Sequence, residues 1–422
     1  MSAARRASAA LRLGVAVSLA ACGAAVVRPV EQKSASGLPP VLAEIDRRVR
    51  ESFWDRALKG VDWAGARRRA AEDLARARTD GERDAAYDRL LALLADSHTF
   101  RLRRGAYSAR AWGTAGLRIG QDGGGYAVKG VIPGSPAERA GMRIGDRVLA
   151  VDGEKYGRER VDFRRLFLAF EGPPGSVLTV AWKPAADGQT PRTARLERAP
   201  EEPGQTLVWK SARVIRRDGR AFGYARLWGI SAETALAVVD LLLDREEVER
   251  ASEALAGWSG IQALLLDARG NSGGYDPNVL ATFLRGRWSA GDYWVRTREG
   301  RRLSPPEYRP LPVALLVNSG TASAGEALAL KFRAHRIGPI VGETTAGMAS
   351  GGAGAFPLPD GSTLWITQRA IEDAGGVSYE GRGVAPDVAA ADRPAARPGE
   401  EEAVVEAALR AIAARPGAGS PP

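Results

Sequence analysis

The chain has 422 residues, more than one small core needs, and we expect two or three domains. Apolar residues make up 45% and charged residues 26%, as in ordinary soluble globular proteins. The formal net charge of +10 comes mainly from scattered arginines, and no stretch interleaves basic with aromatic residues. The composition therefore predicts no nucleic-acid site.

The first 22 residues have the pattern of an export signal. A positively charged start precedes a short apolar run at 13–21, which is too short to cross a bilayer. The run ends at Cys22, the only cysteine of the chain, and this end resembles a bacterial lipobox. That resemblance implies lipidation of Cys22 and anchoring in the cell envelope, at the periplasmic face or outer membrane. A plain secretory signal with a chance cysteine is the alternative.

Residues 23–40 are rich in small residues and proline, which is typical of a linker, and residues 41–112 begin as helices. Apolar residues recur at three-to-four spacing from 41 to 54, and similar periodicity follows at 62–78 and 82–95. We therefore expect an N-terminal helical cap that ends in a histidine-containing motif.

Between residues 113 and 200 the pattern changes to short strands with glycine turns. The stretch 128–153 resembles the central signature of a PDZ domain: a strand, a turn, a short helix capped by Ser135 and a glycine stop at Gly141. The resemblance implies a β-rich module whose loop holds a peptide's terminal carboxylate while the peptide adds as a strand. The loop residues would be Gly116, Leu117, Arg118 and Ile119. An ordinary strand entry is the alternative, and Arg118 stands where such loops usually carry their second glycine.

From 201 to 396 strands alternate with helices, which predicts an α/β layer with a partly parallel sheet. The expected strands are 222–228, 262–267, 313–317, 338–342 and 363–368, and the expected helices are 232–256, 277–285 and 322–334. Residues 397–422 contain a last helix at 399–414 and a tail that we expect to be disordered.

A serine stands where the buried-type strand PVALLV turns into a helix, in the sequence NSGTASAGE at 318–326. At such a turn the hydroxyl of Ser323 is exposed, and the amides of the first helical turn, including that of Ala324, face the group it attacks. The alternative is that Ser323 is simply an N-cap, a position that serine favours.

A glycine-rich turn follows another apolar strand, in LLLDARGNSGG at 264–274. A phosphate-binding loop is disfavoured, because the turn has neither a Lys-Ser/Thr pair nor GxGxxG spacing. Glycine also suits a site where the backbone must approach a substrate closely, such as an oxyanion hole.

The chain contains only two histidines, so a base of ordinary pKa must be one of them. His335 is expected late in a helix, just before a glycine stop, where a cationic side chain stabilises the helix end. His98, in LADSHTF at 94–100, follows the third cap helix at a corner between helix and strand. We therefore favour His98 as the base.

These pieces together resemble peptidase family S41, the C-terminal-processing and tricorn-like peptidases. Residues 96–99 match the family's Asp-x-His-Thr motif, and Glu380 opens a segment, 380–387, that matches its closing motif. All four pieces occur in the family's order, with the PDZ-like segment between the histidine and the serine. The resemblance implies an α/β core of the ClpP and crotonase type, with an oxyanion-hole amide from Gly273 or Gly274.

Met348 distinguishes two branches of that family. The tail-specific peptidases use a Ser-Lys dyad, and Met348 occupies the position of that lysine but cannot accept a proton. Lys331 lies two turns further along the helix from Ser323, where we expect it to be solvated. The remaining resemblance, to the tricorn-like branch, implies a catalytic tetrad of Ser323, His98, Ser97 and Glu380.

We therefore predict a lipid-anchored serine peptidase that cleaves exported or misfolded proteins and binds their C-termini with the PDZ-like segment. No metal or other cofactor is expected, because the two histidines and the single cysteine lack zinc-ligand spacing. One alternative is an inactive S41-fold scaffold at the cell envelope; another is a different hydrolase or a binder of the retinoid type.

Overall fold

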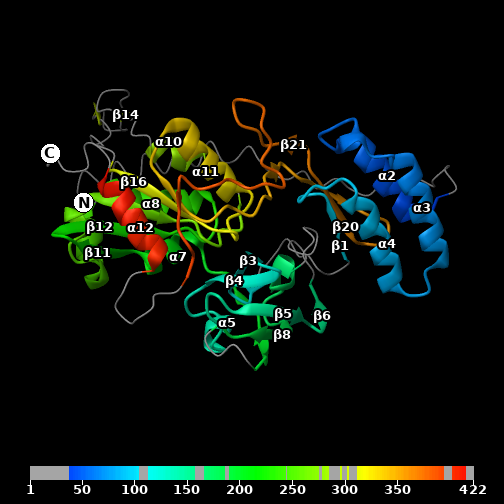
Figure 1. The fold of residues 1–422 in the computed structure, drawn as a ribbon, viewed down its shortest axis with the longest axis horizontal. Coiled ribbons are helices and arrows are strands. Elements are labelled where there is room, and N and C mark those ends of the chain that lie inside the picture. The colour runs from blue at the N-terminus through cyan, green and yellow to red at the C-terminus, as the bar shows by residue number, and fades with distance from the viewer. Residues whose placement is uncertain are drawn as a thin grey trace.

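The structure is a computed structural model. It describes residues 38–103, 113–156, 166–185, 190–243, 245–274, 278–284, 295–296, 302–303, 311–393 and 402–414. The expected export signal with Cys22, most of the linker and the tail after residue 414 lie outside these ranges. The described residues form an α/β core, a β-rich module below it and a helical cap to its right (Figure 1), which confirms the predicted fold class.

The core is built on a six-stranded sheet with the order β11-β12-β13-β16-β17-β22. Its strands are β11 (Arg213–Arg217), β12 (Arg220–Arg226), β13 (Ala263–Asp267), β16 (Val313–Val317), β17 (Ile340–Gly342) and β22 (Val388–Ala389). The β11–β12 hairpin is antiparallel and the other neighbours run parallel. All residues of β13 and β16 are buried, because helices cover both faces of the sheet.

Helices pack on the two faces through alternate strand residues. One face carries α7 (Gly204–Ser211), α8 (Ala232–Leu243), α9 (Arg245–Ala251), α10 (Asn278–Leu284) and α11 (Ala324–His335). The other face carries α12 (Ala403–Ala413). Short strands β14 (Val295–Arg296) and β15 (Arg302–Leu303) form a separate hairpin.

The expected continuous helix at 232–256 is wrong. It is divided into α8 and α9, and two 3-10 turns follow, η2 (Glu253–Leu255) and η3 (Trp258–Gly260). The indole N–H of Trp258 donates to the carbonyl of Leu241 at 2.7 Å, so the chain folds back onto α8. A straight helix would carry Val248, Leu255 and Trp258 away from the cluster in which all three are buried.

The β-rich module, which we call the PDZ-like module, is a sheet with the order β3-β4-β5-β8-β9, and β6 pairs with β5. Its elements are β3 (Leu117–Asp122), β4 (Gly125–Val131), α5 (Pro136–Arg139), β5 (Arg147–Val151), β6 (Glu154–Lys155), β8 (Val177–Lys183) and β9 (Arg192–Glu197). As expected, the Ser135 side chain caps α5 by accepting from the Glu138 N–H, and Gly141 has φ of 80°. The strands at its two ends, β2 (Gly113–Thr114) and β10 (Ala199–Pro200), pair side by side, with β7 (Glu171–Gly172) next to β2.

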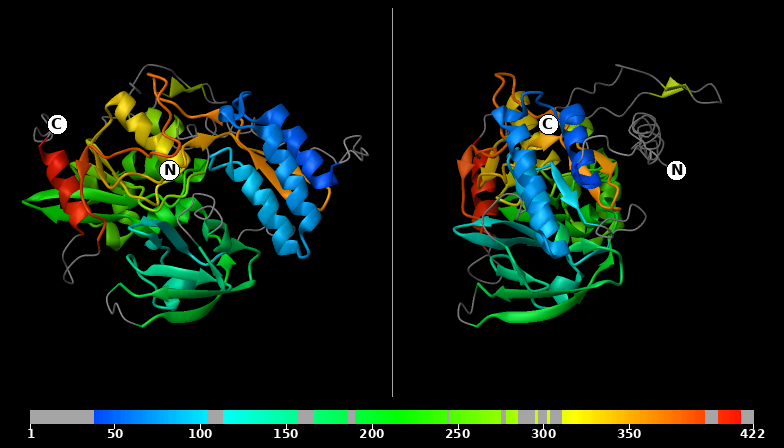
Figure 2. Two further views of the ribbon diagram at one scale, coloured as in Figure 1. Left: turned by 45° about the vertical axis from the view of Figure 1, so that its right-hand side comes forward. Right: turned by 90° about the vertical axis from the view of Figure 1, so that its right-hand side faces the viewer.

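The helical cap packs on a small antiparallel sheet. The helices are α2 (Pro40–Ser52), η1 (Leu58–Gly60), α3 (Trp63–Arg76) and α4 (Asp80–Ala92), and the strands are β1 (Phe100–Leu102), β19 (Gly354–Pro357) and β20 (Thr363–Ile366). The expected core strand at 363–368 is therefore misplaced. It lies as β20 beside β1, next to the cap helices (Figure 2). The reason is that Leu364 and Ile366 bury against the cap helices rather than against the core.

The PDZ-like module contacts the core closely along β3. The Ser319 hydroxyl donates to the carbonyl of Gln121 at 2.8 Å, and a Cβ on Gly120 would lie 2.7 Å from the Gly320 nitrogen. On β4, the buried Lys129 ammonium pairs with Glu343 of the core at 3.1 Å. The module is thus held next to the loop that carries Ser323. Among the helices of the described ranges, none is both long and apolar enough to span a membrane.

Candidate active site

Ser323 lies at the turn from β16 into α11, one residue before the helix begins. Its backbone has φ of 53° and ψ of −119°, a strained conformation for a residue with a side chain. Its N–H donates to the carbonyl of Met348 at 3.1 Å and to Oε2 of Glu326 at 3.2 Å. The Glu326 N–H donates to the backbone carbonyl of Ser323 at 2.9 Å, and Ser323 Oγ lies 3.1 Å from Nε2 of His98.

His98 lies at the expected corner between α4 and β1 and is only 7% exposed. Its backbone N–H donates to Oδ1 of Asp96 at 3.1 Å, which holds the corner. Its Nδ1 lies 2.9 Å from Oγ of Ser97 and 3.0 Å from Oγ of Ser350. A neutral imidazole that accepts from Ser323 at Nε2 carries its hydrogen on Nδ1, where both hydroxyls can accept it.

Glu380 approaches Ser97 from the C-terminal part of the core. Its Oε1 accepts from the Ser97 N–H at 2.9 Å, and its Oε2 accepts from the Ser97 hydroxyl at 3.1 Å. The next residue, Gly381, donates its N–H to the carbonyl of Gly347 at 2.8 Å and so fixes this turn. One chain of hydrogen-bonding distances therefore connects Ser323, His98, Ser97 and Glu380.

Ser350 is a neighbour of His98 that sequence reasoning missed. It begins β18 (Ser350–Gly351), which pairs with β21 (Arg369–Ala370), and its side chain is buried. No motif marks this serine. Its closeness to His98 depends on the path that the chain takes after Met348, which local sequence does not reveal.

Glu326 is a second residue that was missed, although a glutamate three residues after a serine is a capping-box signal. It is fully buried and accepts four hydrogen bonds. The Thr345 hydroxyl (2.6 Å) and the Gly347 N–H (2.8 Å) reach Oε1, and the N–H groups of Met348 (2.8 Å) and Ser323 (3.2 Å) reach Oε2. Burial raises the pKa of Glu326 to about 7, and the four donors oppose this rise because they stabilise the carboxylate.

The glycine turn at 270–274 approaches Ser323 directly. A Cβ on Gly273 would lie 2.5 Å from Cβ of Ser323, so this position accommodates only glycine. The Gly273 N–H donates to Oδ1 of Asn271 at 2.9 Å. Within the described residues, the N–H groups of Gly274 and Ala324 donate no hydrogen bond. These two amides therefore remain available to an acceptor, whereas that of Gly273 is engaged by Asn271.

The four residues expected to bind a carboxylate lie at the start of β3. Gly116 has φ of 83°, donates its N–H to the Thr114 hydroxyl at 2.9 Å and accepts from Ile132. The side chains of Leu117 and Ile119 are buried in the module core, and Arg118 pairs with Glu171 at 3.2 Å. These contacts hold the segment as an edge strand of the module sheet.

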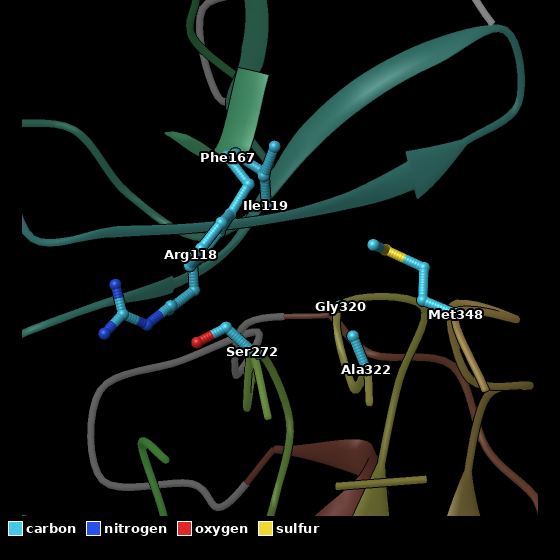
Figure 3. A pocket seen from close by; sticks show the side chains of 8 residues that line it. Arg118, Ile119, Phe167, Ser272, Gly320, Ala322 and Met348 are labelled. Atoms are coloured by element: carbon cyan, nitrogen blue, oxygen red, sulfur yellow. The ribbon is translucent and has the colours of Figure 1, made fainter. Parts of the chain in front are cut away.

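A narrow pocket separates this edge from the core. Its lining residues are Arg118, Ile119, Phe167, Gly270, Ser272, Gly320, Ala322 and Met348. Figure 3 shows that the Met348 side chain points from the core side of the pocket toward the PDZ-like module. Met348 therefore packs at the junction of module and core, as its buried contacts also indicate.

The other titratable candidates lie away from this group. His335 ends α11 and is exposed, and the next residue, Arg336, adopts the left-handed conformation (φ 52°) that we had expected of a glycine. Lys331 is half-buried further along α11. In the part of the chain that the structure describes, no cluster of three or more His, Cys, Asp or Glu side chains could hold a metal ion.

The sequence of this chain matches the models of two known protein families. Residues 221–390 match the model of peptidase family S41, and residues 128–179 match that of the PDZ domain. The C-terminal processing peptidase of Tetradesmus obliquus chloroplasts is 30% identical over 81% of this chain and 75% of its own length. Two tricorn protease homologs of Streptomyces coelicolor are 29% and 27% identical, but this chain spans only 30% and 36% of their lengths.

The solved structure of a photosystem II D1 C-terminal processing protease is similar to this fold. It is 26% identical, covers 83% of this chain and 92% of its own, and superimposes with a TM-score of 0.51. The family match covers the strands and turns that carry Ser323, Gly273 and Glu380, and the relative of 30% identity extends the match over most of the chain. The chain belongs to peptidase family S41.

Proposed function

We propose that this protein is a serine peptidase in which Ser323 is the nucleophile and His98 its general base. The observation that carries the proposal is the 3.1 Å distance between Ser323 Oγ and His98 Nε2. This distance allows the hydroxyl hydrogen to pass directly to the imidazole. The strained backbone of Ser323 also supports this role, since such strain persists where surrounding contacts enforce it, often at functional sites.

In the proposed reaction, Ser323 Oγ forms a bond to the carbonyl carbon of a peptide while His98 takes its proton. The imidazolium then gives that proton to the leaving amine as the C–N bond breaks, which leaves an acyl-enzyme. Water attacks the acyl carbon, loses a proton to His98 and releases Ser323. Ser97 and Glu380 act as positioning residues that hold Nδ1–H and favour the charged imidazole.

The oxyanion of the tetrahedral intermediate needs donors on the side opposite to His98. The candidates are the amides of Ala324 and Gly274, which donate no hydrogen bond within the described residues, and Gly273 is less available because of its bond to Asn271. Loss of one such donor typically costs about 3–4 kcal/mol of transition-state stabilisation.

We further propose that the substrates are proteins or peptides and that the PDZ-like module binds their C-termini. Support comes from the match to the PDZ domain and from the names of several relatives, which are C-terminal processing peptidases. An extended peptide would add along β3, the edge strand of the module sheet, beside the pocket between module and core. Lipid attachment at Cys22 would place the enzyme on exported substrates in the cell envelope.

The decisive experiment is labelling with a fluorophosphonate, which reacts with activated serines. Wild-type protein should be labelled and should cleave an unstructured peptide, whereas Ser323→Ala should do neither while retaining its fold. A matched control is Ser362→Ala, which removes a buried hydroxyl beside β20 that bonds Asp360 and Arg101, and which should leave both readouts unchanged. Absence of labelling in folded wild-type protein would favour the inactive scaffold.

A further inference from the structure

We propose that Ser350 is a second positioning residue for His98, which with Asp96 forms a branch parallel to that of Ser97 and Glu380. This inference rests on the proposed function. Its basis is that two hydroxyls, not one, lie within hydrogen-bonding distance of Nδ1: Ser97 at 2.9 Å and Ser350 at 3.0 Å.

The geometry connects the two hydroxyls to each other and to separate carboxylates. Their Oγ atoms are 3.2 Å apart. Ser97 donates to Glu380 at 3.1 Å, and Ser350 has a longer contact of 3.5 Å to Oδ1 of Asp96. Because Nδ1–H offers a single hydrogen, the two hydroxyls share it or exchange it, and each retains its own hydrogen for a carboxylate or for the other hydroxyl.

Asp96 is suited to support such a branch. Its side chain is fully buried, and Oδ1 already accepts from the His98 N–H and from the Thr367 hydroxyl. Within the described residues its Oδ2 has no hydrogen bond, and the nearest cation is the ammonium of Lys59 at 3.9 Å. Within the described residues, Asp96 and Glu380 are the carboxylates that hydrogen bonds connect to His98, and Lys59 lies behind Asp96.

Rigid anchors on both sides fix the position of Ser350. On one side, the Met348 N–H is bonded to the buried Glu326 carboxylate. On the other side, β18 pairs with β21 in the register Ser350 to Ala370. A side chain held in this way loses little additional freedom when it accepts the Nδ1 hydrogen, so it can orient the imidazole effectively.

The test compares Ser350→Ala, Ser97→Ala and the double variant in the full-length protein. Each single change should lower kcat about 3- to 10-fold, the value of one hydrogen bond, because the other hydroxyl still accepts from Nδ1. The double variant should lose more than the product of the single losses, because Nδ1–H then has no hydroxyl partner. KM should change less than twofold in all three, since neither hydroxyl is proposed to contact substrate.

The pH profile separates positioning from a merely structural role. Acceptors at Nδ1 stabilise the imidazolium, so removing one should shift the acid limb of kcat/KM to lower pH. Ser350→Thr, which keeps a hydroxyl at this strand position, should restore both kcat and the position of the acid limb to their wild-type values. If Ser350→Ala does not fold, Ser350→Cys, which is close in size but a weak hydrogen-bonding group, serves for the same comparison.

Two results would overturn this inference. One is a folded Ser350→Ala variant whose kcat and acid limb of kcat/KM equal those of wild type. The other is a double variant whose loss in kcat equals the product of the two single losses. Those results would leave the proposed function intact, since fluorophosphonate labelling of wild-type protein tests Ser323 independently.

Discussion

The backbone N–H of Ser323 donates to the carbonyl of Met348 at 3.1 Å, while the Met348 side chain is buried against the PDZ-like module. The position that carries lysine in Ser-Lys peptidases therefore contacts Ser323 here through its backbone carbonyl. Its side chain has a packing role at the junction between module and core.

This arrangement predicts opposite results for two substitutions. Met348→Leu keeps the backbone bond and nearly the same volume, so kcat should stay within about twofold of wild type, with a stability loss below about 1.5 kcal/mol. His98→Ala should lower kcat by about 10⁴-fold or more, because among the described residues no other base lies within hydrogen-bonding distance of the Ser323 hydroxyl. Steady-state kinetics on one peptide substrate measures both.

The pH dependence of the wild-type enzyme gives an independent check. With an imidazole base, activity should rise with pH as the ring loses its proton. Near-normal kcat in His98→Ala, or an abolished kcat in folded Met348→Leu, would show that the base has been assigned incorrectly.

Glu380→Gln should reduce kcat less than His98→Ala does. The glutamate bonds Ser97 twice, transfers no proton and acts on His98 only through Ser97, so we expect a loss of about 3- to 10-fold, comparable to that of Ser97→Ala. The amide still accepts one bond but directs an NH₂ group toward a donor. Glu372→Gln is the matched control, since it neutralises an exposed acid on the same loop and should have no effect. An equal loss in both variants would indicate that the net charge of the loop, rather than its contact with Ser97, affects activity.

The raised pKa of Glu326 predicts that the free energy of unfolding depends on pH. Its pKa is about 7 in the folded protein and near 4.5 when exposed, so the folded state retains a proton that the unfolded chain loses between these values. The free energy of unfolding should therefore fall as pH rises from about 4.5 to about 7, by about 3 kcal/mol in total. Urea denaturation at pH 5 and pH 8 should show this fall in wild type but not in Glu326→Gln.

The Gln variant should also be less stable at both pH values, because its NH₂ group faces N–H donors. If the free energy of unfolding of wild type shows no more fall between these pH values than that of Glu326→Gln, the four donors keep the carboxylate charged in the folded state.

Local sequence was sufficient to predict an element wherever its periodicity or capping pattern is compatible with only one structure. The buried runs at 263–267 and 313–317, the capped helix after Ser135 and the corner at His98 each follow from periodicity and capping. It was insufficient where tertiary contacts decide where a segment packs. The strand at Leu364 joins the cap because the cap helices bury it, and Ser350 meets His98 only through the path of the chain after Met348.

The membrane prediction concerns Cys22, which lies outside the described residues, and it is tested on the full chain in cells. If Cys22 is lipidated, its acyl chains hold the protein on the membrane, and Cys22→Ser should move it to the soluble exported fraction. A basic surface would also bind anionic lipid, but 1 M salt screens such contacts strongly and leaves an acyl anchor unaffected. Fractionation with and without salt therefore separates the two causes. Salt-resistant membrane association of Cys22→Ser would refute the lipobox interpretation.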